Sequence, residues 1–290
     1  MSRPAALPRL NIVSPHRDDA AFTDGLLMLH WLREGGTVRI INVFTESDFS
    51  HWNLKEWTPD ALTRAWLRLH GPRRDGVRAK IVGKARRLVV SRLRRREDER
   101  MMAALCAGEA RASMLDLHWR DACRRIPCRL KDILNPSMWN DDRVREASEL
   151  SNQLRTLLAG EPVVAPLSVG GHIDHRVVTA ACVKLRDVCP LAFGVDLPYA
   201  TQADPAEIDA QRDTVSAELG VDLESFRVDA PSDAAGAATH RAMVSAYASQ
   251  IVPAQVEQML SYLADGEVCW TTPAFRALCH SEEASTAVTA

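Results

Sequence analysis

Two short polar clusters, far apart in the chain, contain the residue types from which proteins build metal sites. The first is Ser14–Asp19 (SPHRDD) and the second is His172–His175 (HIDH). Two imidazoles and one carboxylate, which His16, Asp19 and His175 can supply, leave coordination positions open, as in catalytic zinc or non-haem iron sites. Because zinc lowers the pKa of bound water to about 7 in favourable cases, this pattern favours hydrolytic chemistry.

Further acid–base groups stand next to these candidate ligands. Asp18 precedes Asp19 and is placed to take a proton from water, whereas His172 is placed to protonate a leaving amine or to stabilise an oxyanion. The competing interpretation is structural. Asp18 and Asp19 would also suit the start of a helix, because carboxylates favour helix N-termini, and His172 would then be an exposed loop residue.

Each cluster directly follows an apolar, β-prone run, at residues 10–13 and 162–167. Residues 23–34 have the apolar pattern of a buried helix, and residues 37–44 form a second β-prone run. A strand, a helix and a strand in so short a segment predict a βαβ unit, and hence a parallel sheet with a right-handed crossover. Ligands bind at the carboxyl ends of strands in such sheets, so we expect the two clusters to meet there.

The rest of the chain continues this alternation of elements. We expect helices at residues 94–107, 143–158, 175–187, 239–249 and 256–263, and strands at residues 112–117 and 193–197. We interpret residues 1–280 as one α/β domain, with a helical insertion at 47–93 near the site and a frayed tail at 281–290.

Composition excludes several classes of protein. The chain has 290 residues, of which 46% are hydrophobic, and a net charge of −2, so we expect neither a nucleic-acid nor a membrane partner. No apolar stretch approaches the ~20 residues of a membrane span, and the seven cysteines include no C-x-x-C pair. We therefore expect a cytoplasmic protein with reduced thiols. Nothing in the sequence predicts an oligomeric state.

One segment is strongly basic, since residues 86–100 include seven arginines interleaved with three acidic residues. Two interpretations remain open for it. The segment is either a solvated helix face with internal ion pairs or a clamp for an anionic substrate.

The two polar clusters also resemble the motifs of a known family, the PIG-L (LmbE-like) zinc-dependent N-deacetylases. Residues 14–21 look like its His-Pro-Asp-Asp motif, and residues 172–175 look like its His-x-Asp-His motif. Residues 95–105 with 117–122 resemble the family's helix–strand–Asp-Ala segment, and residues 240–250 resemble its late helix ending in Tyr-x-Ser-Gln. These segments follow one another in the family's order.

The resemblance implies a Rossmann-like, three-layer α/β sandwich with a mostly parallel central sheet. It also implies zinc-dependent hydrolysis of an N-acyl group, typically an acetyl group on an amino sugar. The family's metal ligands correspond to His16, Asp19 and His175 of this chain. Its general base corresponds to Asp18, and the residue that stabilises the oxyanion or protonates the amine corresponds to His172.

Two further positions have counterparts in the family, and two depart from it. Asp174 matches the motif's aspartate, which orients a neighbouring imidazole, and Asp121 matches a position near the substrate pocket. Arg17 replaces the usual proline, which removes a restraint on φ and adds a cation that we expect to contact substrate. Ala20 replaces a glutamate that is not a metal ligand. The insertion at 47–93 has no family counterpart that we can place.

These observations predict a metal-dependent amide hydrolase, with Zn²⁺ or another divalent metal as cofactor. It would remove an N-acetyl or other N-acyl group from a small molecule or glycoconjugate that contains an amino sugar. A second hypothesis keeps the site but gives it a non-sugar N-acyl metabolite of a biosynthetic pathway. A third is a non-catalytic binding protein, because a fold does not fix a function. The absence of G-x-G-x-x-G after the first strand argues against a dehydrogenase.

Overall fold

The computed structural model describes residues 7–47, 77–106, 111–126 and 130–280, and for residues 77–87, 130, 131 and 280 it describes the backbone alone. Within these residues the centre is a seven-stranded sheet with the strand order β3-β2-β1-β4-β5-β7-β6. The strands are β1 (Arg9–Ser14), β2 (Thr37–Asn42), β3 (Ala112–Asp116), β4 (Val163–Pro166), β5 (Leu191–Gly194), β6 (Glu224–Val228) and β7 (Glu267–Thr271). Neighbouring strands are parallel except for the two pairs that involve β7.

Helices cover both faces of this sheet. They are α1 (Asp19–Thr23), α2 (Gly25–Arg33), α4 (Val77–Cys106), α5 (Ala122–Arg125), α6 (Asp141–Leu158), α7 (Ile173–Val183), α8 (Pro205–Leu219), α9 (Ala234–Ser245), α10 (Pro253–Tyr262) and α11 (Pro273–His280). Short 3-10 helices lie at η1 (Leu130–Leu134), η2 (Pro136–Met138) and η3 (Tyr199–Thr201).

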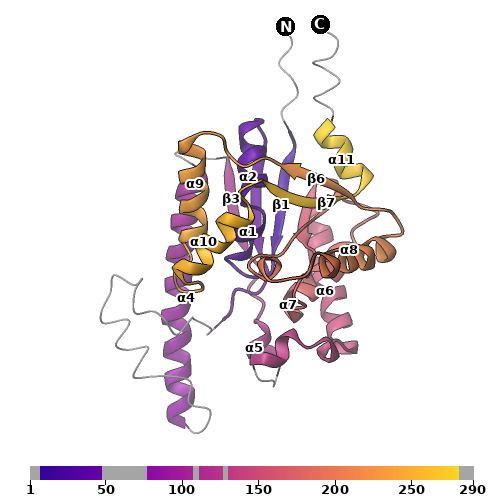
Figure 1. Ribbon diagram of the computed structural model, residues 1–290. Coiled ribbons are helices and arrows are strands. Elements are labelled where there is room, and N and C mark those ends of the chain that lie inside the picture. The colour runs from indigo at the N-terminus through magenta and orange to yellow at the C-terminus, as the bar shows by residue number, and fades with distance from the viewer. Residues whose placement is uncertain (1–6, 48–76, 107–110, 127–129, 281–290) are drawn as a thin grey trace, which may run out of the picture.

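The helices form the two outer layers of a sandwich. From β1 to β3 the chain moves toward one edge of the sheet, and from β4 to β5 it moves toward the other edge. Because the crossovers are right-handed, α2 and α4 lie on one face of the sheet and α6 and α7 lie on the other. The helix α9 packs against α2 and α4, and α8 packs against α7. Figure 1 draws α4 and α9 on one side, and α6, α7 and α8 on the other. The predicted three-layer α/β sandwich with a mostly parallel sheet is confirmed.

The strand order reverses between β1 and β4, which are neighbours in the sheet. At such a switch point the loops after the two strands turn apart and leave a crevice at the carboxyl ends. The first polar cluster (residues 14–19) lies at the end of β1, and the second (residues 172–175) follows β4. The prediction that both clusters follow neighbouring ends of a parallel sheet is therefore confirmed.

The strands around this switch point are almost wholly buried. Every residue of β4 and β5, and every residue of β1 except Arg9, is buried, as expected for parallel strands covered on both faces. The helix α2 adds the buried side chains of Leu26, Leu27 and Trp31. The loops that follow β1 and β4 therefore begin at deeply buried strands in the middle of the sheet.

Several predicted helices have different bounds in the structure, and two of them differ most. The helix expected at residues 23–34 is replaced by α1 and α2, which meet at Asp24. The helix expected at 94–107 is the end of α4, which begins at Val77 and so takes in part of the predicted insertion. Residues 48–76 of that insertion, and the predicted frayed tail, lie outside the described residues. Among the helices that the structure describes, none combines the length and the apolar character needed to cross a membrane.

The outer edge formed by β7 and β6, with the helices α8 and α11, has no counterpart in the sequence predictions. Each of these two strands has five residues, and β6 exposes Glu224, Ser225 and Arg227. The strand β6 is short and lies at the edge of the sheet, so it carries no continuous apolar run and lacks the pattern that predicts the central strands.

Candidate active site

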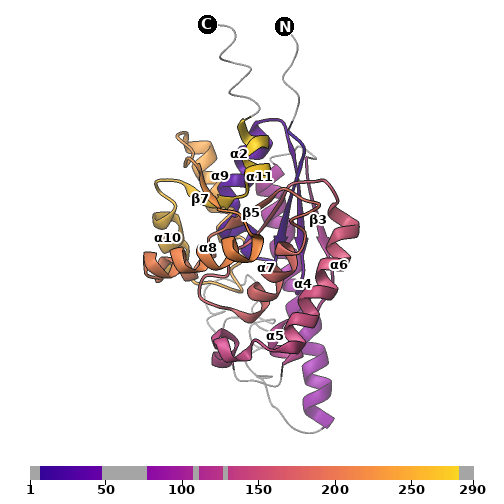
Figure 2. The same ribbon diagram turned by 90° about the vertical axis from the view of Figure 1, so that its right-hand side faces the viewer.

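The two polar clusters meet at the carboxyl ends of β1 and β4. His16 lies in the loop after β1 and Asp19 begins α1, while His172 and His175 lie at the start of α7. The ring centroid of His16 is 5.0 Å from that of His172 and 5.4 Å from that of His175. Figure 2 shows α5 beyond this edge of the sheet.

Three side-chain atoms converge here as a metal site requires. Asp19 Oδ2 lies 3.0 Å from His16 Nδ1 and 3.2 Å from His175 Nε2, and the ligand atoms of this group all lie within 4.8 Å of one another. Among the described residues, buried His175 Nε2 has no hydrogen-bond partner. Leaving a buried polar atom unpaired is costly, and a cation between the three residues would satisfy it. Two nitrogens and a carboxylate oxygen suit Zn²⁺.

The other ring nitrogen of each histidine faces a different carboxylate. His16 Nε2 lies 3.1 Å from Asp174 Oδ2, and His175 Nδ1 lies 2.6 Å from Asp196 Oδ1. Metal-binding histidines commonly direct their second ring nitrogen to such a partner, which fixes the tautomer and the orientation of the ring. Asp174 lies where the family resemblance implies. Asp196 is absent from the sequence analysis, although it follows β5 just as the polar clusters follow β1 and β4.

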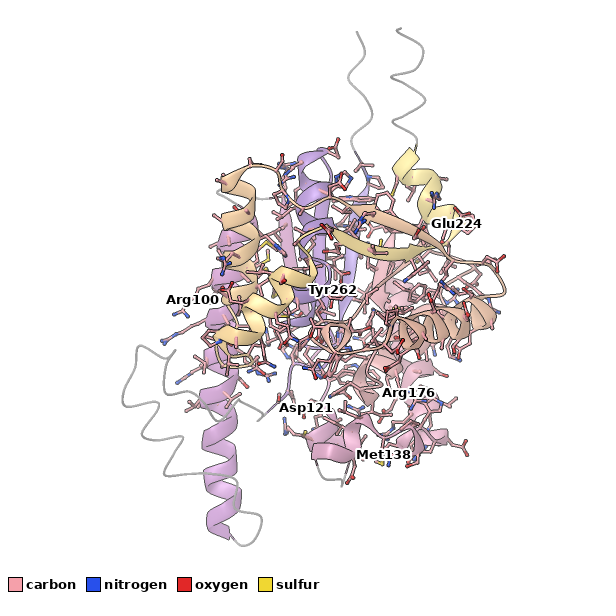
Figure 3. The ribbon with its side chains drawn as sticks, in the orientation of Figure 1. Arg100, Asp121, Met138, Arg176, Glu224 and Tyr262 are labelled. Atoms are coloured by element: carbon pink, nitrogen blue, oxygen red, sulfur yellow. The ribbon has the colours of Figure 1, made fainter. Side chains whose placement is uncertain are left out.

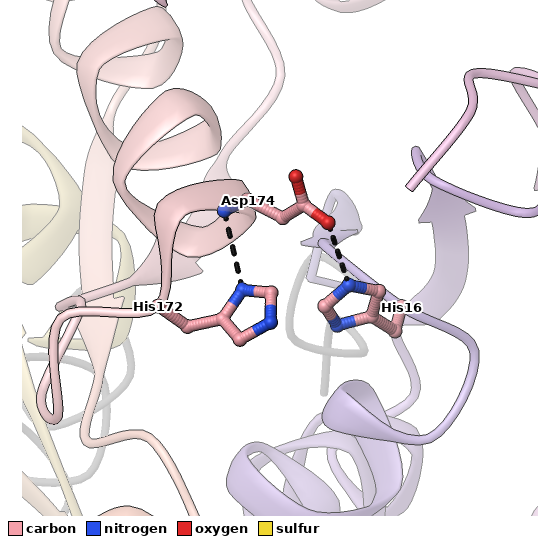
Figure 4. A group of neighbouring side chains, drawn as sticks. All are labelled: His16, His172 and Asp174. Carbon is pink, nitrogen blue, oxygen red and sulfur yellow. Dashed lines mark hydrogen bonds and ion pairs between the residues drawn. The ribbon is translucent and has the colours of Figure 1, made fainter. Parts of the chain in front are cut away.

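His16, His172 and Asp174 form a second, overlapping group of candidate ligands, but both oxygens of the Asp174 carboxylate already have partners. Asp174 Oδ1 accepts a hydrogen bond from Arg125 at 2.8 Å, and Oδ2 accepts one from the backbone N–H of Ala122 at 2.9 Å. Figure 4 shows the contact of His16 with the same carboxylate, and the backbone N–H of Asp174 that donates to His172 Nδ1. The first group is therefore the better candidate for a metal.

The buried carboxylates determine the charge of this cluster. Burial lowers the pKa of His16, but the charge of Asp19 and the contact with Asp174 outweigh burial and raise that pKa to about 9. Burial likewise lowers the pKa of His175, yet Asp19 and Asp196 hold it well above its usual value. The negative potential that favours protons on both imidazoles is the same potential that favours a divalent cation between them.

Asp18 immediately precedes α1 but makes no capping hydrogen bond with its side chain, which argues against the purely structural interpretation of this residue. Its carboxylate instead lines a cavity beside the candidate metal ligands. Burial and the charge of Asp19 raise the pKa of the Asp18 carboxyl, and the charges of Arg94 and His16 oppose that shift. A raised pKa brings a carboxylate closer to the proton affinity that a general base needs near neutral pH.

His172 both caps a helix and faces the cavity. Its Nδ1 accepts a hydrogen bond of 3.2 Å from the backbone N–H of Asp174 at the start of α7, which assigns the ring proton to Nε2. Burial and the charge of His16 lower the pKa of His172 to about 3, so this imidazole is neutral near pH 7. The ring of Tyr199 packs beside it, with its centroid 6.5 Å from that of His172 and 5.7 Å from that of His175.

The cavity has a volume of about 270 Å³, and Arg94 contributes a cation to its wall. Arg94 belongs to the basic segment of α4 but is only 4% exposed, and it donates a hydrogen bond to Gln250, which also lines the cavity. Arg95, by contrast, has a side chain that is 79% exposed and lies 4.0 Å from Glu99. The two interpretations of the basic segment thus apply to different residues, a solvated face at Arg95 and a cation in the cavity at Arg94.

The two residues expected to contact substrate are placed differently. Asp121 lines the cavity and caps α5, where its carboxylate accepts a hydrogen bond of 3.2 Å from the backbone N–H of Arg124. Figure 3 labels Asp121 between the sheet and α5. Arg17 is outside the cavity wall that the described residues form. The structure does not bring Arg17 to this cavity, because its buried guanidinium is turned to the carboxylates of Asp98 and Asp116.

The chain matches the protein family described as PIG-L, GlcNAc-PI de-N-acetylase, over residues 11–185. It is also 31% identical over 205 residues to the 2'-N-acetylparomamine deacetylase of Streptomyces fradiae. The matched region is 69% of this chain and 61% of that protein, so the chain spans about three-fifths of the length of this relative.

Solved structures share the fold at low sequence identity. The deacetylase–bog complex from the biosynthesis pathway of teicoplanin has a TM-score of 0.60 and 18% identity, and the match covers 91% of this chain and 97% of that one. The zinc inhibited form of teicoplanin deacetylase Orf2 has a TM-score of 0.59 with the same identity and coverage. Both structures support the α/β fold described above.

Proposed function

Because this chain belongs to the PIG-L (GlcNAc-PI de-N-acetylase) family, we propose that it is a metal-dependent N-deacetylase. It hydrolyses the amide of an N-acetyl group on a small molecule that contains an amino sugar, and it releases acetate and a free amine. The main observation behind this proposal is that the ligand atoms of His16, Asp19 and His175 converge. Next to them in the chain is Asp18, whose carboxylate makes no capping hydrogen bond to α1.

The residues that would hold the metal are His16, Asp19 and His175. Zn²⁺ held there supplies Lewis acidity that polarises the acyl carbonyl and lowers the pKa of a bound water. Asp174 and Asp196 accept hydrogen bonds from the far sides of the two imidazoles, which leaves His16 Nδ1 and His175 Nε2 unprotonated and available as ligands.

Asp18 is the proposed general base. Its carboxylate takes one proton from the attacking water, and the raised pKa that burial gives it lets it hold this proton until the C–N bond breaks. The proton then passes to the departing nitrogen, so that the amine leaves in its neutral form. One carboxyl group thus serves as base in the first step and as acid in the second.

His172 is the proposed donor to the oxyanion. The hydrogen bond from the backbone of Asp174 occupies Nδ1, so the single ring proton of the neutral imidazole is on Nε2 and can be donated to the carbonyl oxygen as charge develops there. This assignment favours the oxyanion role over proton delivery to the amine, because an imidazole that stays neutral has no second proton to give.

The cavity suits a hydroxylated ring. Arg94, Asp121 and Gln250 offer polar groups to sugar hydroxyls, while Phe22 and Ile251 offer apolar contacts. A volume of about 270 Å³ is at the small end for ligand cavities, so the acetylated sugar ring enters and the rest of the substrate stays outside. The 2'-N-acetylparomamine deacetylase, whose name denotes an N-acetylated substrate, supports this choice.

Metal content and amine release test the proposal together. We expect elemental mass spectrometry to find one zinc ion per wild-type chain and none in His16→Ala, and zinc-loaded wild type to release amine from a panel of N-acetylated amino sugars. Asp18→Asn should keep the metal and lose about 10²–10⁴-fold in kcat. A wild type that cannot be loaded with any divalent metal would contradict the proposal. A loaded enzyme that cleaves only non-sugar amides would favour a tailoring hydrolase instead.

A further inference from the structure

Arg17 lies between His16 and Asp18 in the chain, yet its side chain is turned away from the cavity that both of them line. We infer that Arg17 is a positioning residue, which fixes the metal-binding loop (residues 14–19) by joining it to α4 and β3. The inference deepens the proposed function, on which it rests for the role of His16 and Asp18, and it concerns how this loop is held.

The guanidinium of Arg17 spans two elements. Its Nη1 donates to Asp98 on α4, and its Nη2 donates to Asp116 at the end of β3. These partners are 81 and 99 residues away in the chain, so the contacts are tertiary. Arginine suits this position, because its planar, permanently charged fork presents donors in fixed directions to more than one acceptor.

Both carboxylates are also held from their far sides. The hydroxyl of Tyr247 donates to Asp98 Oδ1 at 3.1 Å, and Asn42 Nδ2 donates to Asp116 Oδ1 at 3.2 Å. Tyr247 follows α9 and packs edge-on against Phe22 of α1, with ring centroids 5.8 Å apart. The carboxylates of Asp98 and Asp116, which accept hydrogen bonds from Arg17, are therefore held in place by other residues. The ion pairs thus join the loop to groups whose positions are set elsewhere in the fold.

The loop's internal hydrogen bonds set its shape but do not join it to α4. The backbone N–H of His16 donates to Asp19 at 2.8 Å, and the hydroxyl of Ser14 accepts from the backbone N–H of Ala20 at 3.0 Å. Arg17 supplies an ion pair, with Asp98, that links this turn to α4. Because a buried charge without its partner is strongly unfavourable, the guanidinium restricts the loop to conformations that keep both ion pairs.

Arg17 serves the site by holding the loop in position, not by placing a positive charge in the cavity. Two carboxylates compensate its cation, and its side chain is 9% exposed. Among the described arginines and lysines, Arg94 is the one that lines the same cavity as Asp18. Removal of the Arg17 guanidinium should therefore loosen the loop without taking a substrate-binding charge out of the cavity.

The test compares Arg17→Met with Arg17→Lys and with a matched control, Arg39→Met. Arg39 on β2 also makes a tertiary ion pair and a hydrogen bond, to Glu161 at 2.9 Å and to Asn11 at 2.7 Å. The control removes a guanidinium with comparable contacts from a strand of the sheet, at a position outside the proposed site. For each variant, amide hydrogen exchange of the metal-free protein, zinc affinity by chelator competition, and kcat and KM would be measured.

We expect the Arg17→Met protein to exchange amides faster in residues 14–24, to bind zinc about 10-fold more weakly or worse, and to lose about 10²-fold in kcat with little change in KM. Arg17→Lys, which keeps the charge but can reach one carboxylate at a time, should fall between Arg17→Met and wild type. Arg39→Met should lose thermal stability, with wild-type exchange at residues 14–24 and wild-type zinc affinity.

Wild-type loop exchange and zinc affinity in a folded Arg17→Met protein would overturn the inference. If Arg17→Met does not fold, the same result in Arg17→Lys would overturn it. Hydrogen exchange separates this inference from the proposed function, because faster exchange confined to the loop supports a positioning role even if wild type takes up no metal.

Discussion

His175 Nδ1 lies 2.6 Å from Asp196 Oδ1, and each of the two side chains is 1% exposed. His16 has an equivalent relationship to Asp174, whose Oδ2 lies 3.1 Å from His16 Nε2. Each proposed metal-binding imidazole is therefore oriented by a buried carboxylate from another element. Because Asp196 follows β5, three neighbouring strands, β1, β4 and β5, contribute to a single centre.

The Asp196 contact predicts a loss of metal affinity in Asp196→Asn. Asparagine keeps the shape of the side chain but not its charge, so it should hold His175 less firmly and make its imidazole a weaker ligand. We expect zinc to bind about 10–100-fold more weakly, as measured by competition with a chromophoric chelator. Asp187→Asn is the control, since it changes an exposed carboxylate that pairs with Arg155 at 3.0 Å. Equal zinc affinities in Asp196→Asn and wild type would contradict the role of Asp196.

The lowered pKa of His172 predicts how activity depends on pH. A pKa lowered to about 3 keeps the imidazole neutral at every pH above that value, so His172 should contribute no ionisation to the rate between about pH 5 and 9. His172→Gln should lower kcat by about 10²–10³-fold and leave the shape of the pH–rate profile unchanged. An alkaline limb that is present in wild type and missing in His172→Gln would show instead that His172 acts as a protonated acid.

The comparison of site and sequence shows which residues a pattern can identify. His16, Asp18, Asp19, His172 and His175 stand in compact groups directly after apolar runs, so their convergence follows from the parallel sheet alone. Asp196 follows a strand too, but a single aspartate after a strand is too common to indicate a site. The direction of the Arg17 side chain depends on carboxylates that only tertiary packing brings near, so the local sequence gives no sign of it.

Gly170 and Tyr199 provide a prediction about the cavity wall. A Cβ added to Gly170 would lie 2.8 Å from the ring of Tyr199, and the backbone there has a φ of +77°. We expect Gly170→Ala to displace the ring that packs on His172 and His175, and so to lower kcat.

The control for that substitution is Gly160→Ala. Gly160 has a φ of +81°, but a Cβ there meets no atom within 4 Å. Both variants should lose about 1 kcal/mol of stability to the left-handed backbone, as measured by thermal unfolding. An effect on kcat is expected in Gly170→Ala alone. Equal activities of the two variants would show that the close approach of Gly170 to the ring of Tyr199 does not matter for catalysis.

Glu267 predicts a pH dependence of stability. This buried carboxyl of β7 accepts hydrogen bonds from the backbone N–H groups of Leu26 at 2.8 Å and Leu27 at 3.3 Å, at the start of α2. Burial raises its pKa from the usual 4.5 to about 8. The folded state thus binds this proton more tightly than the unfolded state, so the stabilisation is complete below about pH 4.5 and is lost as pH rises through about 8.

Glu267→Gln removes this titrating group and keeps a neutral side chain of similar shape. Its free energy of unfolding relative to that of wild type should therefore rise between pH 5 and 8, by on the order of 3 kcal/mol. Urea unfolding at several pH values measures this difference. A difference that stays constant across the range would show that Glu267 keeps the same charge in the folded and unfolded states.

The same residue shows why part of the fold lies beyond sequence patterns. The central strands β1 and β2 are rich in buried apolar side chains, and local sequence predicts them well. The division between α1 and α2 at Asp24 depends instead on Glu267, which lies 241 residues after Leu26 and accepts the N–H of that residue. No pattern near Asp24 indicates this partner, so a single helix is predicted where the structure has two.

The family match ends at residue 185, and this boundary divides the cavity wall. The proposed metal ligands and Asp18 all come before it, whereas Tyr199, Gln250 and Ile251 come after it. The residues proposed to break the amide bond and one part of the cavity wall are thus encoded in separate stretches of the gene. Mutations in the second stretch can change which molecules enter while sparing the first, so evolution can adapt an existing chemistry to new substrates.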